Sequence, residues 1–215
     1  MKKQTKVFSV LFLIIVVLHI FGLLYNETLG ALTKPFITIL LAVVYLSAVK
    51  KPSFWYISAL FFSFWGDTFL LFKDQFFLFG LVSFLMAHIL YIKISSGYLR
   101  KIGFTKIITA SIPFVLVFGS IVLLIKDNLG DMLIPVIIYG IIISAFGTLT
   151  LLNYLQQKTT ENLWLFLGAL IFIISDSFLA VNKFHEAREM YGVTIMVTYI
   201  VAQYLICKAM IIKDS

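Results

Sequence analysis

Charged residues are scarce in this 215-residue chain. Lys, Arg, Asp and Glu together make up 13% of it, about half of what soluble domains carry. Hydrophobic residues, by contrast, make up 61%. A water-soluble fold of this length could not bury so much apolar surface in one core, so a soluble globular protein is excluded and the surrounding solvent must be lipid.

Cysteine is almost absent as well. The single Cys207 excludes an intrachain disulfide and a cysteine-based metal cluster. A zinc site needs three or four converging ligands, and the three histidines lie in separate segments or loops without close spacing. A serine nucleophile is not indicated either, because the chain lacks the G-x-S-x-G motif. No metal site is therefore expected.

The apolar runs are continuous, which favours helices over the alternating strands of a membrane β-barrel. The first run has no cleavage site after it, so we expect it to be retained as the first helix. The second is the shortest, and Pro35 is expected in its first turn, where proline is tolerated. The predicted segments are 7–25, 35–49, 53–72, 76–94, 105–125, 131–154, 161–181 and 191–212. The sequence thus predicts an all-α, polytopic membrane bundle of about eight transmembrane helices in a single domain, 1–215.

The formal charge is +7. In a membrane protein this reflects basic cytoplasmic loops beside anionic lipid, so no nucleic-acid partner is expected. If the N-terminus is cytoplasmic and every segment crosses, 12 of the 17 basic residues fall inside. The N-terminus and the C-terminus are therefore both predicted inside, in a multi-pass protein of a bacterial cytoplasmic membrane. The five basic residues outside are Lys34, Lys73, Lys126, Lys183 and Arg188.

The two halves of the chain carry similar motifs. Residues 66–70 read GDTFL and residues 175–179 read SDSFL; the helices that follow them carry Ala-His at 87–88 and Ala-Gln at 202–203. This similarity suggests two four-helix units in parallel orientation, as in some transporter folds. The predicted units are 1–104 and 105–215.

The motifs place one aspartate in each unit, Asp67 and Asp176, each about six residues before the outer end of its segment. A carboxylate in hydrocarbon costs several kcal/mol, so such residues usually face the bundle interior or a wet cavity. Two carboxyl groups in one poorly solvated site tend to share a proton, which suits acid/base catalysis. The alternative is that each aspartate only fixes packing by accepting a hydrogen bond from a neighbouring helix.

Other polar residues could serve the same site. His88 and Tyr91 share one face of segment 76–94 and could form a proton relay or a polar floor; the alternative is an interhelical hydrogen bond. Tyr199 and Gln203 share a face of the last segment and could line the cavity.

On the outer side, Lys34, Asn182 and Lys183 could contact a phosphate head group, since lysine is a good point-charge ligand for phosphate. Ordinary snorkelling to the interface would explain the lysines equally well. Gly140, Ser144 and Thr148 form a stripe of small residues on segment 131–154, which indicates close helix packing.

Several of these stretches resemble the YhhN family, which includes the mammalian lysoplasmalogenases. They are residues 33–36 (TKPF), 66–92, 168–184 and 198–206. The resemblance implies an eight-helix membrane hydrolase that cleaves the vinyl-ether bond of a lysoplasmalogen. Its partners would be a lysophospholipid substrate and membrane lipid, and the products would be a fatty aldehyde and glycerophospho-ethanolamine or -choline. It implies no metal or organic cofactor, and the family's two aspartates correspond to Asp67 and Asp176.

The main alternative function is a proton-coupled membrane transporter of a small or lipidic substrate, which would also have intramembrane acids and an internal repeat. Transporters more often show helices broken by glycine or proline at corresponding positions. Segments 53–72 and 161–181 contain no proline, and their glycines, Gly66 and Gly168, do not correspond. A third possibility is a non-catalytic lipid-binding scaffold.

Overall fold

The computed structural model describes residues 3–215, except for the side chains of residues 73 and 74. Within that part the chain forms helices and turns and no strand. The long helices are α1 (Lys3–Tyr25), α2 (Glu27–Ala48), α3 (Phe54–Phe69), α4 (Lys73–Tyr98), α5 (Phe104–Ile125), α6 (Leu133–Gln156), α7 (Thr160–Phe184) and α8 (Glu189–Lys213). With the 3₁₀ turn that extends α3 to Phe72, all eight are long and apolar enough to span a membrane. The predicted all-α bundle of eight helices is confirmed.

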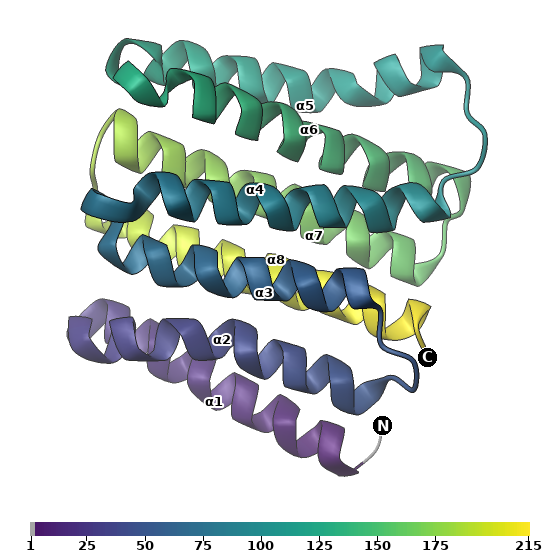
Figure 1. Ribbon diagram of the computed structural model, residues 1–215, viewed down its shortest axis with the longest axis horizontal. Coiled ribbons are helices and arrows are strands. Elements are labelled where there is room, and N and C mark those ends of the chain that lie inside the picture. Colours follow the sequence, from purple (N-terminus) through teal and green to yellow (C-terminus); the bar gives the residue numbers. More distant parts are fainter. Residues whose placement is uncertain (1–2) are drawn as a thin grey trace.

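Helices that follow one another in the chain run antiparallel (Figure 1). Close pairs form between α1 and α2, α3 and α4, and α7 and α8, while α4 contacts α6 and α8 contacts α2 across the two halves. Both chain ends lie at the same end of the bundle (Figure 1), as an even number of crossings requires. A duplicated four-helix unit would give this pattern of contacts; the duplication itself stays a prediction.

Local signals explain where several helices begin. The Asn26 side chain accepts a hydrogen bond from the Leu29 N–H at 3.1 Å and so caps α2. Thr159 caps α7 in the same way through the Asn162 N–H. Such caps satisfy backbone donors that have no partner inside the helix. The turn between α5 and α6 contains Gly130 at φ +49°, a backbone conformation that glycine adopts without strain.

The predicted start of the second segment at Pro35 is wrong. Helix α2 begins at Glu27, so Pro35 lies well inside it. Two features account for the longer helix: the Asn26 cap, and the close approach of α1 and α2 at Gly22 and Gly30, where a Cβ on Gly22 would collide with the Gly30 backbone. Lys34 is therefore held on a helical turn packed against α1 instead of at a helix end.

The interior is not purely apolar. Helix α8 is the most enclosed: 56% of its 18-residue apolar stretch is buried, against 11% of the corresponding stretch of α5. Polar side chains are buried among the large apolar ones where α2, α3, α4, α6, α7 and α8 meet. They are Thr38, Ser63, Asp67, His88, Tyr139, Tyr199 and Gln203. Buried polar groups require hydrogen-bond partners, and these partners define the candidate site.

Candidate active site

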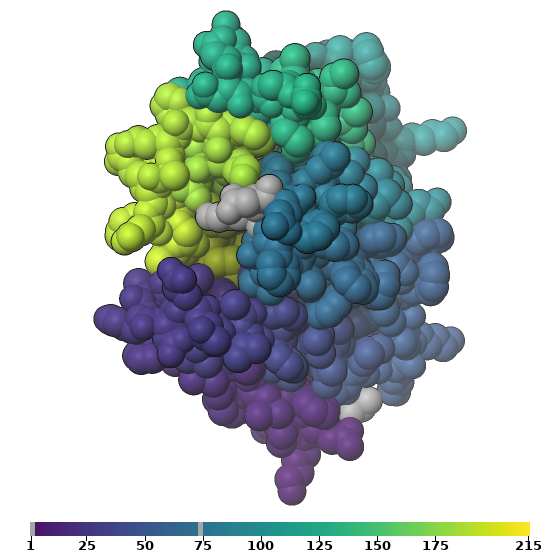
Figure 2. Space-filling model, turned by 60° about the vertical axis from the view of Figure 1, so that its left-hand side comes forward, coloured from purple at the N-terminus to yellow at the C-terminus, as the bar shows by residue number. Residues whose placement is uncertain are grey.

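A cavity of about 470 Å³ lies between α1, α2, α3, α4, α7 and α8. Figure 2 looks toward the end of the bundle at which the helix pairs turn, where the purple α1–α2, blue α3–α4 and yellow-green α7–α8 segments come together. Both Asp67 and Asp176 border this cavity. The two aspartates that the sequence singled out thus share one chamber.

Asp67 is held by two hydroxyl groups from two other helices. Its side chain projects from α3 and is 2% exposed. Its Oδ2 accepts hydrogen bonds from the Thr38 hydroxyl of α2 and the Tyr199 hydroxyl of α8, each at 2.7 Å. Three helices therefore fix the position of this carboxyl group.

Further hydrogen bonds connect the Tyr199 hydroxyl to Gln203 and, through Gln203, to two more side chains. The Gln203 amide Nε2 donates to the Tyr199 hydroxyl at 3.4 Å and to the Ser63 hydroxyl at 3.1 Å. Its Oε1 accepts from the Tyr91 hydroxyl at 3.0 Å. Tyr91, predicted in a proton relay or polar floor, and Gln203, predicted in the cavity lining, are not among the residues that border the cavity; they lie behind Tyr199.

Asp176 has a different set of partners. It projects from α7, is half-buried, and its Oδ2 accepts a 2.5 Å hydrogen bond from the Tyr139 hydroxyl of α6. The Nδ1 of His88 lies 2.8 Å from the Phe84 carbonyl oxygen and 3.4 Å from the Tyr139 hydroxyl. Because a carbonyl oxygen only accepts, this Nδ1 carries the hydrogen, and the Tyr139 hydrogen is left to bond Asp176.

His88 is fully buried and lies outside the lining of the cavity. Its Nε2 has no hydrogen-bond partner among the described residues. Aromatic rings surround the imidazole, the nearest being Phe172, whose centroid is 4.6 Å from that of the imidazole. His88 thus contacts the hydroxyl of Tyr139, the residue that bonds Asp176, just as Gln203 contacts the hydroxyl of Tyr199, which bonds Asp67.

Charged and polar groups gather where the cavity approaches the end of the bundle. Lys34, Asn182 and Lys183 border it, as does Glu27, which the sequence analysis did not single out. The Lys183 ammonium lies 5.5 Å from the centroid of the Phe77 ring. Asn182 also accepts a hydrogen bond from the Arg188 N–H at 3.0 Å and so helps to fix the turn between α7 and α8.

Sequence reasoning missed Thr38 and Tyr139, the hydroxyl partners from α2 and α6. A weak signal was present: each follows a proline of its helix, Pro35 or Pro135, by three or four residues. These contacts agree in part with the alternative interpretation, in which the aspartates only bond hydroxyl groups of neighbouring helices. It does not account for a shared cavity bordered by both carboxyl groups.

No group of three or more His, Cys, Asp or Glu side chains that could hold a metal ion occurs among the described residues.

Comparison with known proteins gives one match. No curated protein is significantly similar to this chain, and no solved structure is either. The sequence profile of the YhhN family matches residues 29–210. That range reaches from the first turn of α2 into the last turn of α8 and includes both aspartates and all of their hydroxyl partners. The chain therefore belongs to the YhhN family.

Proposed function

We propose that this protein is a lysoplasmalogenase-like ether hydrolase that uses Asp67 and Asp176 for acid/base catalysis. The observation that carries the proposal is the shared cavity: two carboxyl groups, each oriented by hydroxyl groups from other helices, border one chamber of about 470 Å³. The chamber also has cationic groups at one end, Lys34 and Lys183. The family resemblance in the aspartate motifs supports the same reaction.

The reaction needs one protonated and one ionised carboxyl group. The acid protonates the vinyl-ether carbon remote from oxygen, which leaves an oxocarbenium ion. The carboxylate removes a proton from water as the water oxygen adds to the cationic carbon, giving a hemiacetal. The hemiacetal then collapses: its hydroxyl loses a proton, the ether oxygen gains one, and the carbon–oxygen bond breaks to give aldehyde and alcohol. This division of labour is similar to that of the glycosidases.

The hydrogen bonds favour one assignment of the two roles. Hydroxyl donors stabilise an ionised carboxylate, and among the described residues Asp67 receives two of them while Asp176 receives one. We assign Asp67 as the carboxylate that steadies the cation and deprotonates water. Asp176, whose Oδ2 accepts the Tyr139 bond, is then the acid that delivers its proton to the alkene carbon.

The spacing along α7 suits a glycerophospholipid. Lys183 follows Asp176 by seven residues, or about 10 Å of helix at 1.5 Å per residue. From phosphorus to the protonated alkene carbon, an extended lysoplasmalogen spans about 9 Å at roughly 1.3 Å per bond. A phosphate held by Lys183 and Lys34 therefore brings the vinyl ether to Asp176. In this position Glu27 can bind the ammonium group of the head group.

Release of aldehyde from a lysoplasmenyl lipid by the purified protein in detergent tests the proposal. Asp67→Asn and Asp176→Asn keep the shape of the side chain, so both variants should fold, and each should lose about 10²- to 10⁴-fold in rate. The matched control is Asp127→Asn, because the Asp127 side chain lies in the α5–α6 turn and is 87% exposed.

The control variant should match the wild type. Full activity in both aspartate variants would overturn the catalytic assignment, and a wild type that binds or moves the lipid without releasing aldehyde would favour a scaffold or a transporter.

A further inference from the structure

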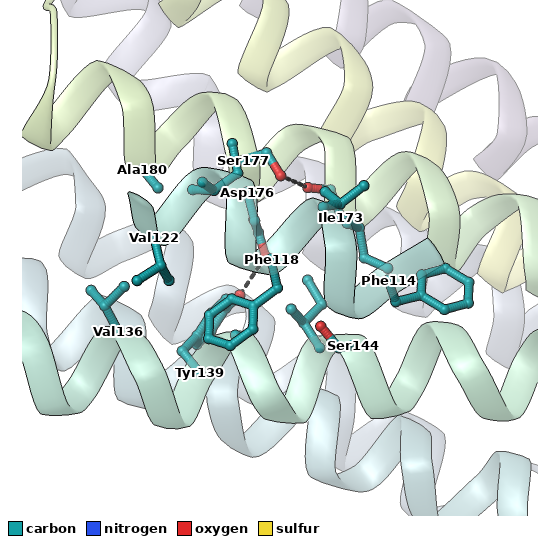
Figure 3. A pocket seen from close by; sticks show the side chains of 14 residues that line it. Phe114, Phe118, Val122, Val136, Tyr139, Ser144, Ile173, Asp176, Ser177 and Ala180 are labelled. Carbon is teal, nitrogen blue, oxygen red and sulfur yellow. Dashed lines mark hydrogen bonds between the residues drawn. The ribbon is translucent and has the colours of Figure 1, made fainter. Parts of the chain in front are cut away.

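A second hollow reaches Asp176 from the side of the bundle. It is a groove of about 60 Å³ between α5, α6 and α7. Figure 3 shows Asp176 extending from α7 to Tyr139 of α6, with the Phe118 ring of α5 beside the pair. Most of the remaining lining is apolar, including Phe114, Val122, Val136, Ile143 and Ile173. Asp176 thus borders both the polar cavity and this apolar groove.

We propose that the groove binds the first carbons of the substrate's alkenyl chain, the part next to the vinyl ether, and that the chain enters sideways from the bilayer. This inference rests on the proposed function and adds a specificity site to it. The vinyl ether is the point at which a polar glycerol meets a hydrocarbon chain. Asp176 is the point at which the polar cavity meets the apolar groove.

The outer wall of the groove faces lipid. Val117, which lines it, is 45% exposed, and its neighbour Leu116 is 65% exposed. A chain in the groove therefore remains continuous with the hydrocarbon of the bilayer. Drawing the whole chain into the cavity would instead place it beside Lys34, Lys183 and Glu27, whose hydration it would displace at a cost.

The size of the groove limits what it can recognise. About 60 Å³ holds roughly two groups the size of a water molecule, so the remainder of the chain stays in lipid. The small residues of α6 produce this shape: Gly140 allows the Phe118 ring to lie against the α6 backbone, where a Cβ would collide with it. Selectivity should therefore depend on branching near the vinyl ether and hardly at all on total chain length.

Kinetic comparison of branched substrates tests this. The wild type should hydrolyse a lysoplasmalogen with a methyl branch near the vinyl ether at least tenfold less efficiently than one with the branch at the chain terminus. Phe118→Ala enlarges the groove and should remove most of that difference, since one or two buried methylene-sized groups correspond to about tenfold in kcat/KM. Leu116→Ala, a control on the lipid-facing side of α5, should leave the ratio unchanged. Equal ratios in the wild type and both variants would overturn the inference.

A binding measurement keeps this inference separate from the proposed function. The probe is a saturated alkyl-ether lysophospholipid, which cannot be hydrolysed, with a photoreactive diazirine near the ether. Cross-links should map to α5 and α6, and Val122→Phe should weaken them while Leu123→Phe, its lipid-facing neighbour at 69% exposure, should not. Labels confined to α1, α2 and α8 would overturn the groove assignment, even if the protein releases aldehyde from a lysoplasmenyl lipid in the separate assay. Labels in the groove without aldehyde release would support chain binding and remove the proposed reaction.

Discussion

Asp67 and Asp176 occupy corresponding motifs in α3 and α7, yet their surroundings differ. Asp67 is almost fully enclosed and accepts two hydroxyl hydrogen bonds. Asp176 is half-buried, accepts one from Tyr139, and borders both the cavity and the groove. The supporting residues differ too, because an amide, Gln203, lies behind Tyr199 while an imidazole, His88, lies behind Tyr139.

This comparison shows how similar motifs can carry different roles. The motif determines where each aspartate lies along its helix, but the chemistry of each carboxyl group depends on neighbours from other helices. Two donors favour a stable carboxylate at Asp67, while a carboxyl group with one donor beside an apolar groove is suited to hold and release a proton at Asp176. The asymmetry between the two carboxyl sites therefore suits the proposed acid/base reaction.

The strongest test of this division of labour is the double variant Asp67→Asn/Asp176→Asn. If both carboxyl groups act in one reaction, the double variant should be no slower than the slower single variant, about 10²- to 10⁴-fold below the wild type, because residues that act as a unit are not additive. Single-turnover release of aldehyde measures this. Losses that multiply in the double variant would show two independent contributions and would contradict a single reaction that uses both carboxyl groups.

Next in size is the effect of removing one hydroxyl group. Tyr139→Phe removes the hydroxyl donor that Asp176 has among the described residues. It should lower kcat about tenfold, because that hydrogen bond strengthens as Asp176 gives up its proton and becomes charged. Tyr199→Phe leaves Thr38 donating to Asp67, so its loss should be smaller. Steady-state kinetics of both variants and of Thr38→Val/Tyr199→Phe decide the order. A larger loss in Tyr199→Phe than in Tyr139→Phe would contradict the assigned roles.

Much of the fold was predictable because the bilayer imposes it. A chain that must satisfy every backbone group within hydrocarbon forms helices, and continuous apolar runs showed where they lie. The start of α2 was missed because a proline read alone favours the first turn of a helix, which placed the start at Pro35. The competing signals were the Asn26 cap and the glycine contact between α1 and α2, and the second of these depends on tertiary packing.

The site was predictable in part. A carboxylate in an apolar segment is expensive and therefore conspicuous, so Asp67 and Asp176 could be found from the sequence. Thr38 could not, because a Thr hydroxyl in a membrane helix usually bonds its own backbone, as Thr148 does with Ser144. Tyr139 could not either, because the sequence does not tell which neighbouring helix a tyrosine hydroxyl reaches. Only the packing of α2 and α6 directs these two hydroxyl groups at the carboxyl groups.

The halves also differ in how their first helix pairs are held, and glycine variants measure this. Gly22→Ala forces a methyl group into the Gly30 backbone, whereas Gly140→Ala meets the movable ring of Phe118. Gly22→Ala should lower the free energy of unfolding by about 1–3 kcal/mol and Gly140→Ala by less. Gly119→Ala, with no atom within 4 Å of the added carbon, is the control and should not lower it.

Thermal unfolding of the three variants in one detergent gives the ranking. Equal destabilisation by Gly22→Ala and Gly119→Ala would show that the α1–α2 contact does not hold the wall of the cavity.

The smallest expected effect concerns the head group, which both halves would contact in the proposed binding mode: Glu27 and Lys34 belong to α2, and Lys183 belongs to α7. Glu27→Gln should raise KM about threefold for a substrate whose phosphate carries an ammonium group, and leave KM unchanged for one with a bare phosphate. The effect is small because Glu27 is exposed and its charge is screened by salt, so the difference should shrink further at high ionic strength. Glu161→Gln, at the other end of α7, is the control. An equal rise in KM for both substrates would show that Glu27 shapes the cavity without binding the ammonium group, and that the head group is read through its phosphate alone.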